Sequence, residues 1–166
     1  MSSENIFNAK TVFEINEINQ KYRGKKIGFT CSSFDLLHAG NLLLLQDSKS
    51  VCDILVVGLQ VDIYSEGSKP LNGRYKPIQD IIEREIQIRS CKYVDEVIFY
   101  ATEDDLLNIL KNLNPDVRIL GSDWENKKYT GYNLTIDVHF HNKFHDWNTL
   151  NLRKRIYNAE KGSFKY

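Results

Sequence analysis

An unbroken apolar run, DILVVGLQ at residues 53–60, constrains the fold more than any other part of the sequence. A strand that is apolar on both faces must be covered on both faces, which is typical of a parallel sheet flanked by helices. Further strands are predicted at residues 25–31, 95–100, 116–121 and 135–140, and helices at residues 13–22, 40–50, 78–90, 103–113 and 148–162. This alternation predicts an α/β fold, a Rossmann-like parallel sheet of about five strands with helices on both faces.

The chain of 166 residues has the length of one ordinary domain. No internal repeat, low-complexity run or linker rich in Pro and Gly divides the sequence. We therefore predict a single domain at 1–166, made of a helical lead-in at 1–24, a core at 25–156 and a C-terminal tail at 157–166.

The charge and the cysteines exclude several classes of protein. Lys plus Arg and Asp plus Glu both number 22, so the net charge is zero and no long-range field attracts nucleic acid or an anionic membrane. The three cysteines are odd in number and widely spaced, which argues against a disulfide framework or a zinc site, and no metal ligands are predicted. With no leader or apolar span in view, we expect a cytoplasmic protein that binds neither nucleic acid nor membrane.

The string CSSFDLLHAGN, at residues 31–41, lies between the first predicted strand of the sheet and the helix that follows it. Ligands of open parallel sheets bind at the carboxyl ends of the strands, where the N–H groups and dipole of a helix N-terminus attract phosphate. His38 and Asn41 stand three apart at the mouth of this helix and are candidate donors to a phosphate. A single histidine at a helix start is more often structural, so the hypothesis depends on the whole string.

That string resembles the G-x-F-D-L-L-H-x-G-H signature of the cytidylyltransferases of the glycerol-3-phosphate type. KYVDEVI, PDVRILGSDW and HDWNTLNLRKRI are similar in order and spacing to further blocks of the same family, the last standing where R-T-E-G-I-S-T-T precedes the final helix. The resemblance covers about Lys25 to Ile156. The lead-in, KTVFEINEINQKYRGKK, is instead similar to the segment that precedes the signature in bacterial ADP-heptose adenylyltransferases.

The resemblance implies a nucleotidyltransferase that transfers CMP, or less readily AMP, from CTP or ATP to a small phosphorylated alcohol or sugar. An acceptor phosphate would attack the α-phosphate in line and release pyrophosphate without a covalent enzyme intermediate. Catalysis is then positioning and charge neutralisation. The resemblance also implies Mg²⁺, held mainly through the nucleotide phosphates, and a homodimer.

Matching the family motifs residue by residue gives a predicted site. The predicted nucleotide-binding residues are Ser33, Phe34, Asp35, His38, Gly40, Asn41, Gly121, Asp123, Trp124, Lys143, Trp147, Asn148 and Thr149. The predicted catalytic residues are His38, Asn41, Lys76 and Lys143. Arg74 and Lys76, in a long polar loop, are predicted to clamp substrate phosphates, although such a charged loop is equally compatible with a solvated surface. Trp124 either lines the nucleotide pocket or only ends a strand.

Three departures from the family motifs bear on activity. Asn41 replaces the second signature histidine, which removes an imidazole but keeps an N–H donor. Asp146 and Leu150 replace a glycine and a threonine of the closing block. These changes keep open a second reading, a non-catalytic nucleotide-binding module descended from such an enzyme. A lysine that contacts glycerol phosphate in the family would fall near Leu106, so the acceptor is expected to differ from glycerol 3-phosphate.

Overall fold

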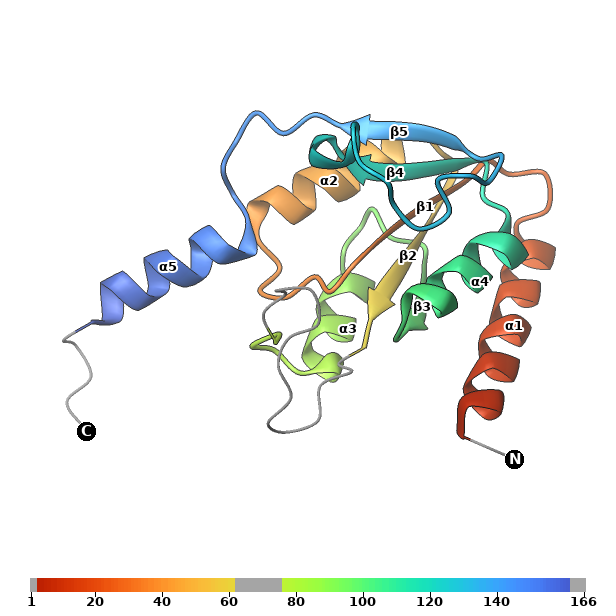
Figure 1. Ribbon diagram of the computed structural model, residues 1–166, viewed down its shortest axis with the longest axis horizontal. Coiled ribbons are helices and arrows are strands. Elements are labelled where there is room, and N and C mark those ends of the chain that lie inside the picture. Colours follow the sequence, from red (N-terminus) through yellow and green to blue (C-terminus); the bar gives the residue numbers. More distant parts are fainter. Residues whose placement is uncertain (1–2, 62–75, 162–166) are drawn as a thin grey trace.

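The computed structural model describes residues 3–61 and 76–161, with side chains from Lys10 onward (Figure 1). The helices are α1 (Ser3–Lys21), α2 (Ala39–Ser50), α3 (Ile81–Arg89), α4 (Glu103–Leu113) and α5 (Thr149–Glu160), with a short 3₁₀ turn, η2, at Ser122–Trp124. The strands are β1 (Ile27–Ser32), β2 (Ile54–Gln60), β3 (Glu96–Tyr100), β4 (Val117–Gly121) and β5 (Asp137–His141).

The five strands form one parallel sheet in the order β3-β2-β1-β4-β5, which confirms the predicted Rossmann-like α/β fold. The chain order reverses direction at β1, because β2 and β3 lie on one side of it and β4 and β5 on the other. Such a switch point leaves a crevice at the carboxyl end of β1. The strand predicted at 135–140 is β5, at Asp137–His141, and it lies at the sheet edge.

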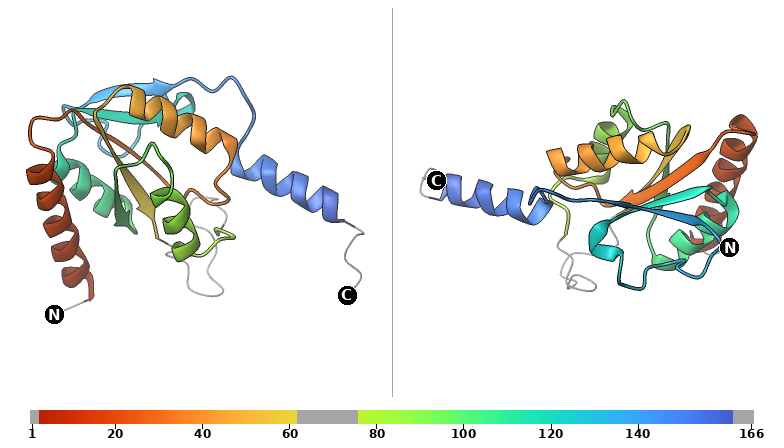
Figure 2. Two further views of the ribbon diagram at one scale, coloured as in Figure 1. Left: turned by 180° about the vertical axis from the view of Figure 1, so that it is seen from behind. Right: turned by 90° about the horizontal axis from the view of Figure 1, so that it is seen from above.

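Strand β2, which lies between β1 and β3, is buried on both faces, as its apolar run predicted. Val56 packs in a cluster with α1 and α4, whereas Leu55, Val57 and Leu59 pack in a second cluster with α2 and α3. Figure 2 shows these two pairs of helices on opposite sides of the sheet. Burial of each such side chain stabilises the fold by about 1.5–3 kcal/mol, so β2 is the centre of the core.

Helix ends differ from the sequence prediction where a capping side chain sets them. α3 begins at Ile81 and not at residue 78, because the Asp80 carboxylate accepts a hydrogen bond from the Glu83 amide at 2.9 Å and caps the helix. α1 is longer than the predicted helix at 13–22, and Gly24, with φ of 80°, follows it. Asn148 caps α5, as expected from the sequence.

α5 projects from the body of the molecule, and only its N-terminal part, as far as Arg153, contacts the rest of the described fold (Figures 1 and 2). None of its residues is buried. The helix runs through the boundary predicted between core and tail at residue 157. Across the described residues, no helix has both the length and the apolar character needed to cross a membrane.

Candidate active site

The turn after β1 is held in an unusual backbone conformation. Phe34 and Leu36 have φ of 48° and 50°, in the left-handed region that non-glycine residues rarely adopt. Phe34 is buried in the core, and the Asp35 carboxylate between them accepts hydrogen bonds from the amides of Ile78 and Gln79 at 2.9 and 3.0 Å. Strain of about 1–3 kcal/mol per residue persists only where the surroundings fix it, and here burial and Asp35 do so.

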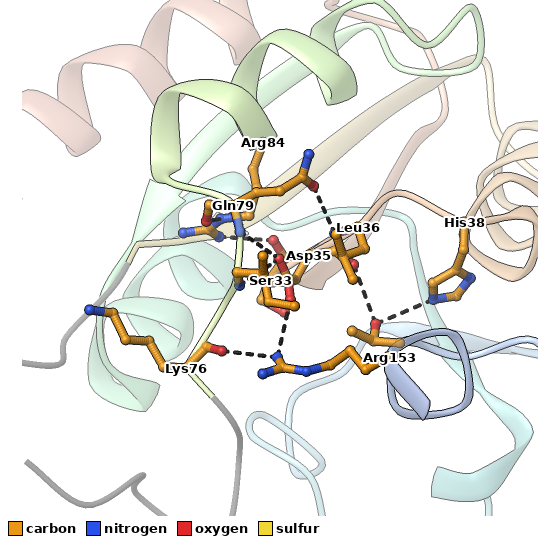
Figure 3. Close-up of polar contacts among 10 residues, drawn as sticks. Ser33, Asp35, Leu36, His38, Lys76, Gln79, Arg84 and Arg153 are labelled. Carbon is orange, nitrogen blue, oxygen red and sulfur yellow. Dashed lines mark hydrogen bonds and ion pairs between the residues drawn. The ribbon is translucent and has the colours of Figure 1, made fainter. Parts of the chain in front are cut away.

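A fully buried arginine joins this turn to the neighbouring strand. Arg84 Nη1 donates to the carbonyl oxygens of Ser33 and Gln60 at 2.8 and 2.7 Å, and its Nε donates to Gln79 O at 3.2 Å (Figure 3). The carboxyl ends of β1 and β2 are thereby tied to the start of α3. Arg84 is not among the residues predicted from the sequence, although a cation on the apolar face shared with Ile88 was a usable signal.

His38 is the N-cap residue of α2 and forms a reciprocal pair with Asn41. His38 Nδ1 accepts from the Asn41 amide, and Asn41 Oδ1 accepts from the His38 amide, both at 3.3 Å. Because Nδ1 accepts, the ring hydrogen lies on Nε2, which is 3.3 Å from Thr149 Oγ1. Burial, the nearby His145 ring and the positive charges of Lys143 and Arg155 hold the pKa of His38 below its usual value. His38 is therefore a neutral Nε2–H donor at neutral pH.

A cavity of about 260 Å³ lies between the starts of α2 and α5 and the carboxyl end of β4. It gathers most of the predicted site residues: His38, Gly40, Asn41, Gly121, Asp123, Trp124, Lys143, Trp147, Asn148 and Thr149. The groups that line it are mainly hydrogen-bond donors, beside two helix N-termini whose dipoles favour negative charge. We call it the smaller cavity.

Two contacts shape the smaller cavity. A Cβ on Gly40 would overlap the carbonyl oxygen of Trp147, so only glycine lets the segment before α5 lie against the start of α2. Across the cavity, Lys143 Nζ lies 2.7 Å from Asp123 Oδ1. Burial by itself would raise the pKa of Asp123, but the hydrogen bond and charge of Lys143 outweigh it and hold the pKa below its usual value. Asp123 is therefore ionised at neutral pH.

Other predicted site residues lie elsewhere. The Phe34 and Asp35 side chains are turned into the fold, and Ser33 lines a second cavity. The Lys76 side chain extends away from His38, while its carbonyl accepts from Arg153 Nη1 at 3.1 Å (Figure 3). Arg74 lies outside the described residues.

Two further residues of the closing block can be placed. Asn148 lines the smaller cavity, yet its Oδ1 accepts from the Asn151 amide at 2.8 Å, so this oxygen serves the helix cap. Asp146 lies on a separate hollow with Lys154 and Arg155, so it does not add a carboxylate to the smaller cavity.

His145 lines the smaller cavity and was not predicted as a site residue. Its Nδ1 accepts from the Trp147 amide at 3.3 Å, and the two rings stack with centroids 4.9 Å apart and an interplanar angle of 19°. Its Nε2 is buried and has no hydrogen-bond partner among the described residues. A histidine inside the block that matches the family motif was the signal available in the sequence.

The second cavity, of about 640 Å³, adjoins the first, and we call it the larger cavity. Cys31, Ser32, Leu120 and Trp124 line both. The remaining wall combines aromatic rings, polar and charged groups and small side chains, namely Ser33, Gln60, Tyr100, Glu103, Leu106, Arg118, Lys128, Tyr129, Thr130 and Tyr132. Aromatic rings beside hydrogen-bonding groups suit an organic ligand with polar substituents.

Arg118, on β4, is the cation deepest in the larger cavity, being only 3% exposed. One guanidinium nitrogen donates to the carbonyl of Thr130, and the group lies over the Tyr129 ring, 5.2 Å from its centroid. Its Nε is buried without a partner among the described residues, so a donor remains for a ligand.

Burial raises the pKa of Cys31 in the shared wall, which keeps this thiol protonated and a poor nucleophile.

Known proteins are similar to this chain over most of its length. The bifunctional protein HldE of Campylobacter curvus is 32% identical over 152 residues, which are 92% of this chain and 32% of that protein. HldE of Paramagnetospirillum magneticum is 38% identical over 112 residues, which are 68% of this chain and 22% of that protein. The chain therefore spans about a third or less of the length of these relatives.

Solved structures support the fold. A lipopolysaccharide core biosynthesis protein from Thermoplasma volcanium matches with a TM-score of 0.57 and 25% identity, over 75% of this chain and all of that one. Pantothenate synthetase from Thermus thermophilus matches with a TM-score of 0.56 and 13% identity, over 85% of this chain and 68% of that one, a likeness of fold alone. A family model described as cytidylyltransferase-like matches residues 29–153. The chain thus belongs to the cytidylyltransferase-like family of nucleotidyltransferases.

Proposed function

We propose that this protein transfers a nucleotidyl group from a nucleoside triphosphate to a small phosphorylated sugar or alcohol and releases pyrophosphate. One observation carries the proposal: a donor-rich cavity at two helix N-termini shares a wall with a larger, aromatic cavity. Two substrates held in adjoining cavities meet at the shared wall, which is the arrangement that group transfer requires.

The triphosphate is assigned to the smaller cavity. His38 Nε2, Thr149 Oγ1 and the Lys143 ammonium all line it, and the N-termini of α2 and α5 add partial positive charge. Asn41 also lines it, and its amide NH₂ is the group able to donate, since its Oδ1 already accepts from the His38 amide. These donors stabilise charge as it moves onto the departing pyrophosphate.

The acceptor is assigned to the larger cavity. Aromatic rings such as Tyr100 and Tyr132 offer flat apolar faces, and Gln60 and Glu103 offer polar groups for hydroxyls. The volume of about 640 Å³ exceeds what a three-carbon polyol phosphate fills, and Leu106 offers no charge to phosphate. A phosphorylated sugar fits this lining better than glycerol 3-phosphate.

The reaction needs no group on the protein to be covalently modified. An oxygen of the acceptor phosphate attacks the α-phosphorus, the bond from that phosphorus to the bridging oxygen breaks, and pyrophosphate leaves. Because the attacking phosphate is already anionic, no general base is required. Mg²⁺ bound to the triphosphate would neutralise charge, and Asp123, the ionised carboxylate in the smaller cavity, suits a metal that takes one or two carboxylates besides phosphates.

The observations leave two nucleoside triphosphates as candidate substrates, CTP and ATP. The signature and the family description favour CTP. Similarity to HldE over 92% of the chain, together with the lead-in that resembles ADP-heptose adenylyltransferases, favours ATP. Both nucleotides therefore belong in the first experiment. The homodimer and the cytoplasmic location expected from the sequence stay predictions.

The proposal is tested by measuring pyrophosphate release from CTP and ATP with Mg²⁺ across a panel of sugar phosphates and polyol phosphates. Turnover with any acceptor supports transfer. If calorimetry shows nucleotide binding and no acceptor of the panel gives turnover, the protein is better described as a non-catalytic nucleotide-binding module. The replacement of the second signature histidine by Asn41 is the reason for considering this alternative. Absence of binding to any triphosphate would refute both.

The acceptor assignment has its own test in Arg118→Met. This change removes the buried guanidinium of the larger cavity and leaves the donors of the smaller cavity in place. We expect KM for the acceptor to rise on the order of tenfold or more, since a hydrogen bond to a charged group contributes about 1.5–3 kcal/mol. The nucleotide Kd should stay unchanged. A rise in the nucleotide Kd alone would place the nucleotide in the larger cavity.

A further inference from the structure

We propose that His145 supplies the second imidazole of the site, replacing the signature histidine whose position Asn41 occupies. The inference rests on the proposed function and deepens it by adding a residue that contacts the reacting phosphates. His145 comes from the segment between β5 and α5, more than 100 residues from the signature string, so no motif in the sequence connects the two.

The first support is position. A Cβ built on Gly40 would lie 3.0 Å from His145 Cε1 and 3.2 Å from His38 Cε1. The two imidazoles therefore flank Gly40 at the start of α2, one residue before Asn41. A histidine at position 41 would project from the same helix end, so His145 brings an imidazole to the place where the family signature has one.

The second support is the direction of the ring hydrogen. The Trp147 amide donates to His145 Nδ1 at 3.3 Å, so the hydrogen of the neutral ring lies on Nε2. His38 is arranged in the same way, with its Nδ1 accepting from the Asn41 amide. Both rings thus have Nδ1 engaged by the backbone and the hydrogen on Nε2, which in His38 lies 3.3 Å from Thr149 Oγ1 and in His145 has no partner among the described residues.

The third support is the missing partner of that donor. His145 Nε2 is buried and unpaired among the described residues, which is a costly state for a polar group in the folded protein. A phosphate oxygen in the smaller cavity would satisfy it. Stacking on Trp147, at 4.9 Å between centroids, fixes the ring plane before the ligand arrives, and a donor that is already oriented loses little on binding.

In the reaction, His145 Nε2–H donates a hydrogen bond to a non-bridging oxygen of the leaving pyrophosphate. The bond from the acceptor oxygen to the α-phosphorus forms as the bond to the bridging oxygen breaks, and negative charge moves onto the pyrophosphate. No proton is transferred in this step. His145 therefore acts as a hydrogen-bond donor that binds the transition state more strongly than the ground state.

The kinetic test compares His145→Ala with His139→Ala. His139 is a matched control because its Nε2 lies 2.9 Å from Asp47 Oδ2, outside the smaller cavity. We expect His145→Ala to lower kcat about a hundredfold, as removal of one oriented donor does, while KM for the nucleotide changes little and His139→Ala stays near the unmodified rate. Retention of kcat by His145→Ala within about threefold would overturn the proposal.

A rescue variant separates catalysis from packing. Adding Asn41→His to His145→Ala returns an imidazole to the same helix end. We expect kcat of this double variant to exceed kcat of His145→Ala by about tenfold. If the double variant gains nothing, and His145→Ala also melts well below the unmodified protein, His145 only supports Trp147 and the proposal is wrong.

A third measurement needs no turnover. Long-range ¹H–¹⁵N spectra of the histidine rings, recorded with CTP or ATP and Mg²⁺, should show His145 Nε2 shifting on nucleotide binding while the His139 ring does not shift. If the protein releases no pyrophosphate yet shows this shift, the proposed function is refuted, while the contact between His145 Nε2 and the bound nucleotide is supported. Nucleotide binding without a shift at His145 would overturn the inference even in an active enzyme.

Discussion

Replacing the buried arginine by an apolar side chain of similar length, Arg84→Met, should destabilise the protein strongly. Among the described residues, the guanidinium donates to three backbone carbonyls, at 2.8 Å to Ser33, 2.7 Å to Gln60 and 3.2 Å to Gln79. Each hydrogen bond from a charged donor contributes about 1.5–3 kcal/mol. Methionine fills the space and leaves all three carbonyls without these donors.

The net loss is smaller than the sum of the three hydrogen bonds. Burying a cation is itself costly, and methionine removes that cost. Ser33 and Gln60 also line the larger cavity, where water can replace part of the lost hydrogen bonding. We therefore expect the free energy of unfolding to fall by about 3 kcal/mol, which is below the sum of the three hydrogen bonds and large for a single substitution. For a chain of this size that lowers Tm by roughly 6–12 °C.

Urea unfolding followed by circular dichroism measures this change, with m-values compared between variants. Arg89→Met is the matched control on the same helix, because Arg89 pairs only at the surface, with Glu85 at 2.8 Å. Its effect should stay within about 0.5 kcal/mol. If Arg84→Met costs no more than Arg89→Met, the guanidinium does not hold β1, β2 and α3 together and the reasoning fails.

Two further predictions concern His38. His38→Ala should lower kcat by on the order of a hundredfold through loss of the Nε2–H donor, with a change in Tm of only a few degrees; a collapse in Tm without a kinetic defect would make it a structural residue. The lowered pKa of His38 means that the unfolded chain binds more protons near its usual value of about 6.5. The free energy of unfolding should therefore fall as pH drops from about 7 toward the lowered folded pKa, and His38→Gln should flatten that dependence in pH-resolved urea titrations; an unchanged slope would contradict the burial of His38.

The fold was predictable from the sequence because its strongest signal is local. β2 is apolar at every buried position. The acidic residues at the start of α4 and the capping residue Asn148 mark the first turns of α4 and α5 in the sequence. The start of α3 was misplaced because Ile78 fits the helical spacing while Asp80, two residues later, caps the helix. Spacing locates a helix, and only the capping contacts fix its end.

The candidate site was predictable only where blocks that resemble the family motifs supply its residues. The family blocks indicated His38, Lys143 and Thr149, which the fold brings into one cavity. Arg84 and Arg118 escaped notice because their roles depend on carbonyls and rings from distant segments, and a sequence pattern does not carry those contacts. Matching a residue to a motif also does not identify which of its atoms donates or accepts a hydrogen bond.

Two cavities with one shared wall make it possible for such a protein to change its substrate by small steps. The larger cavity is lined by Lys128, Tyr129 and Tyr132 from the loop before β5, whereas the donors of the smaller cavity come from the start of α2, the segment after β5 and the start of α5. Substitutions in that loop reshape one cavity and leave the donors of the other in place, which is how surface loops on a rigid scaffold diversify. If the larger cavity binds the acceptor as proposed, paralogues could exchange acceptors while keeping the same chemistry, and a gene library confined to codons 127–132 would reproduce that divergence in the laboratory.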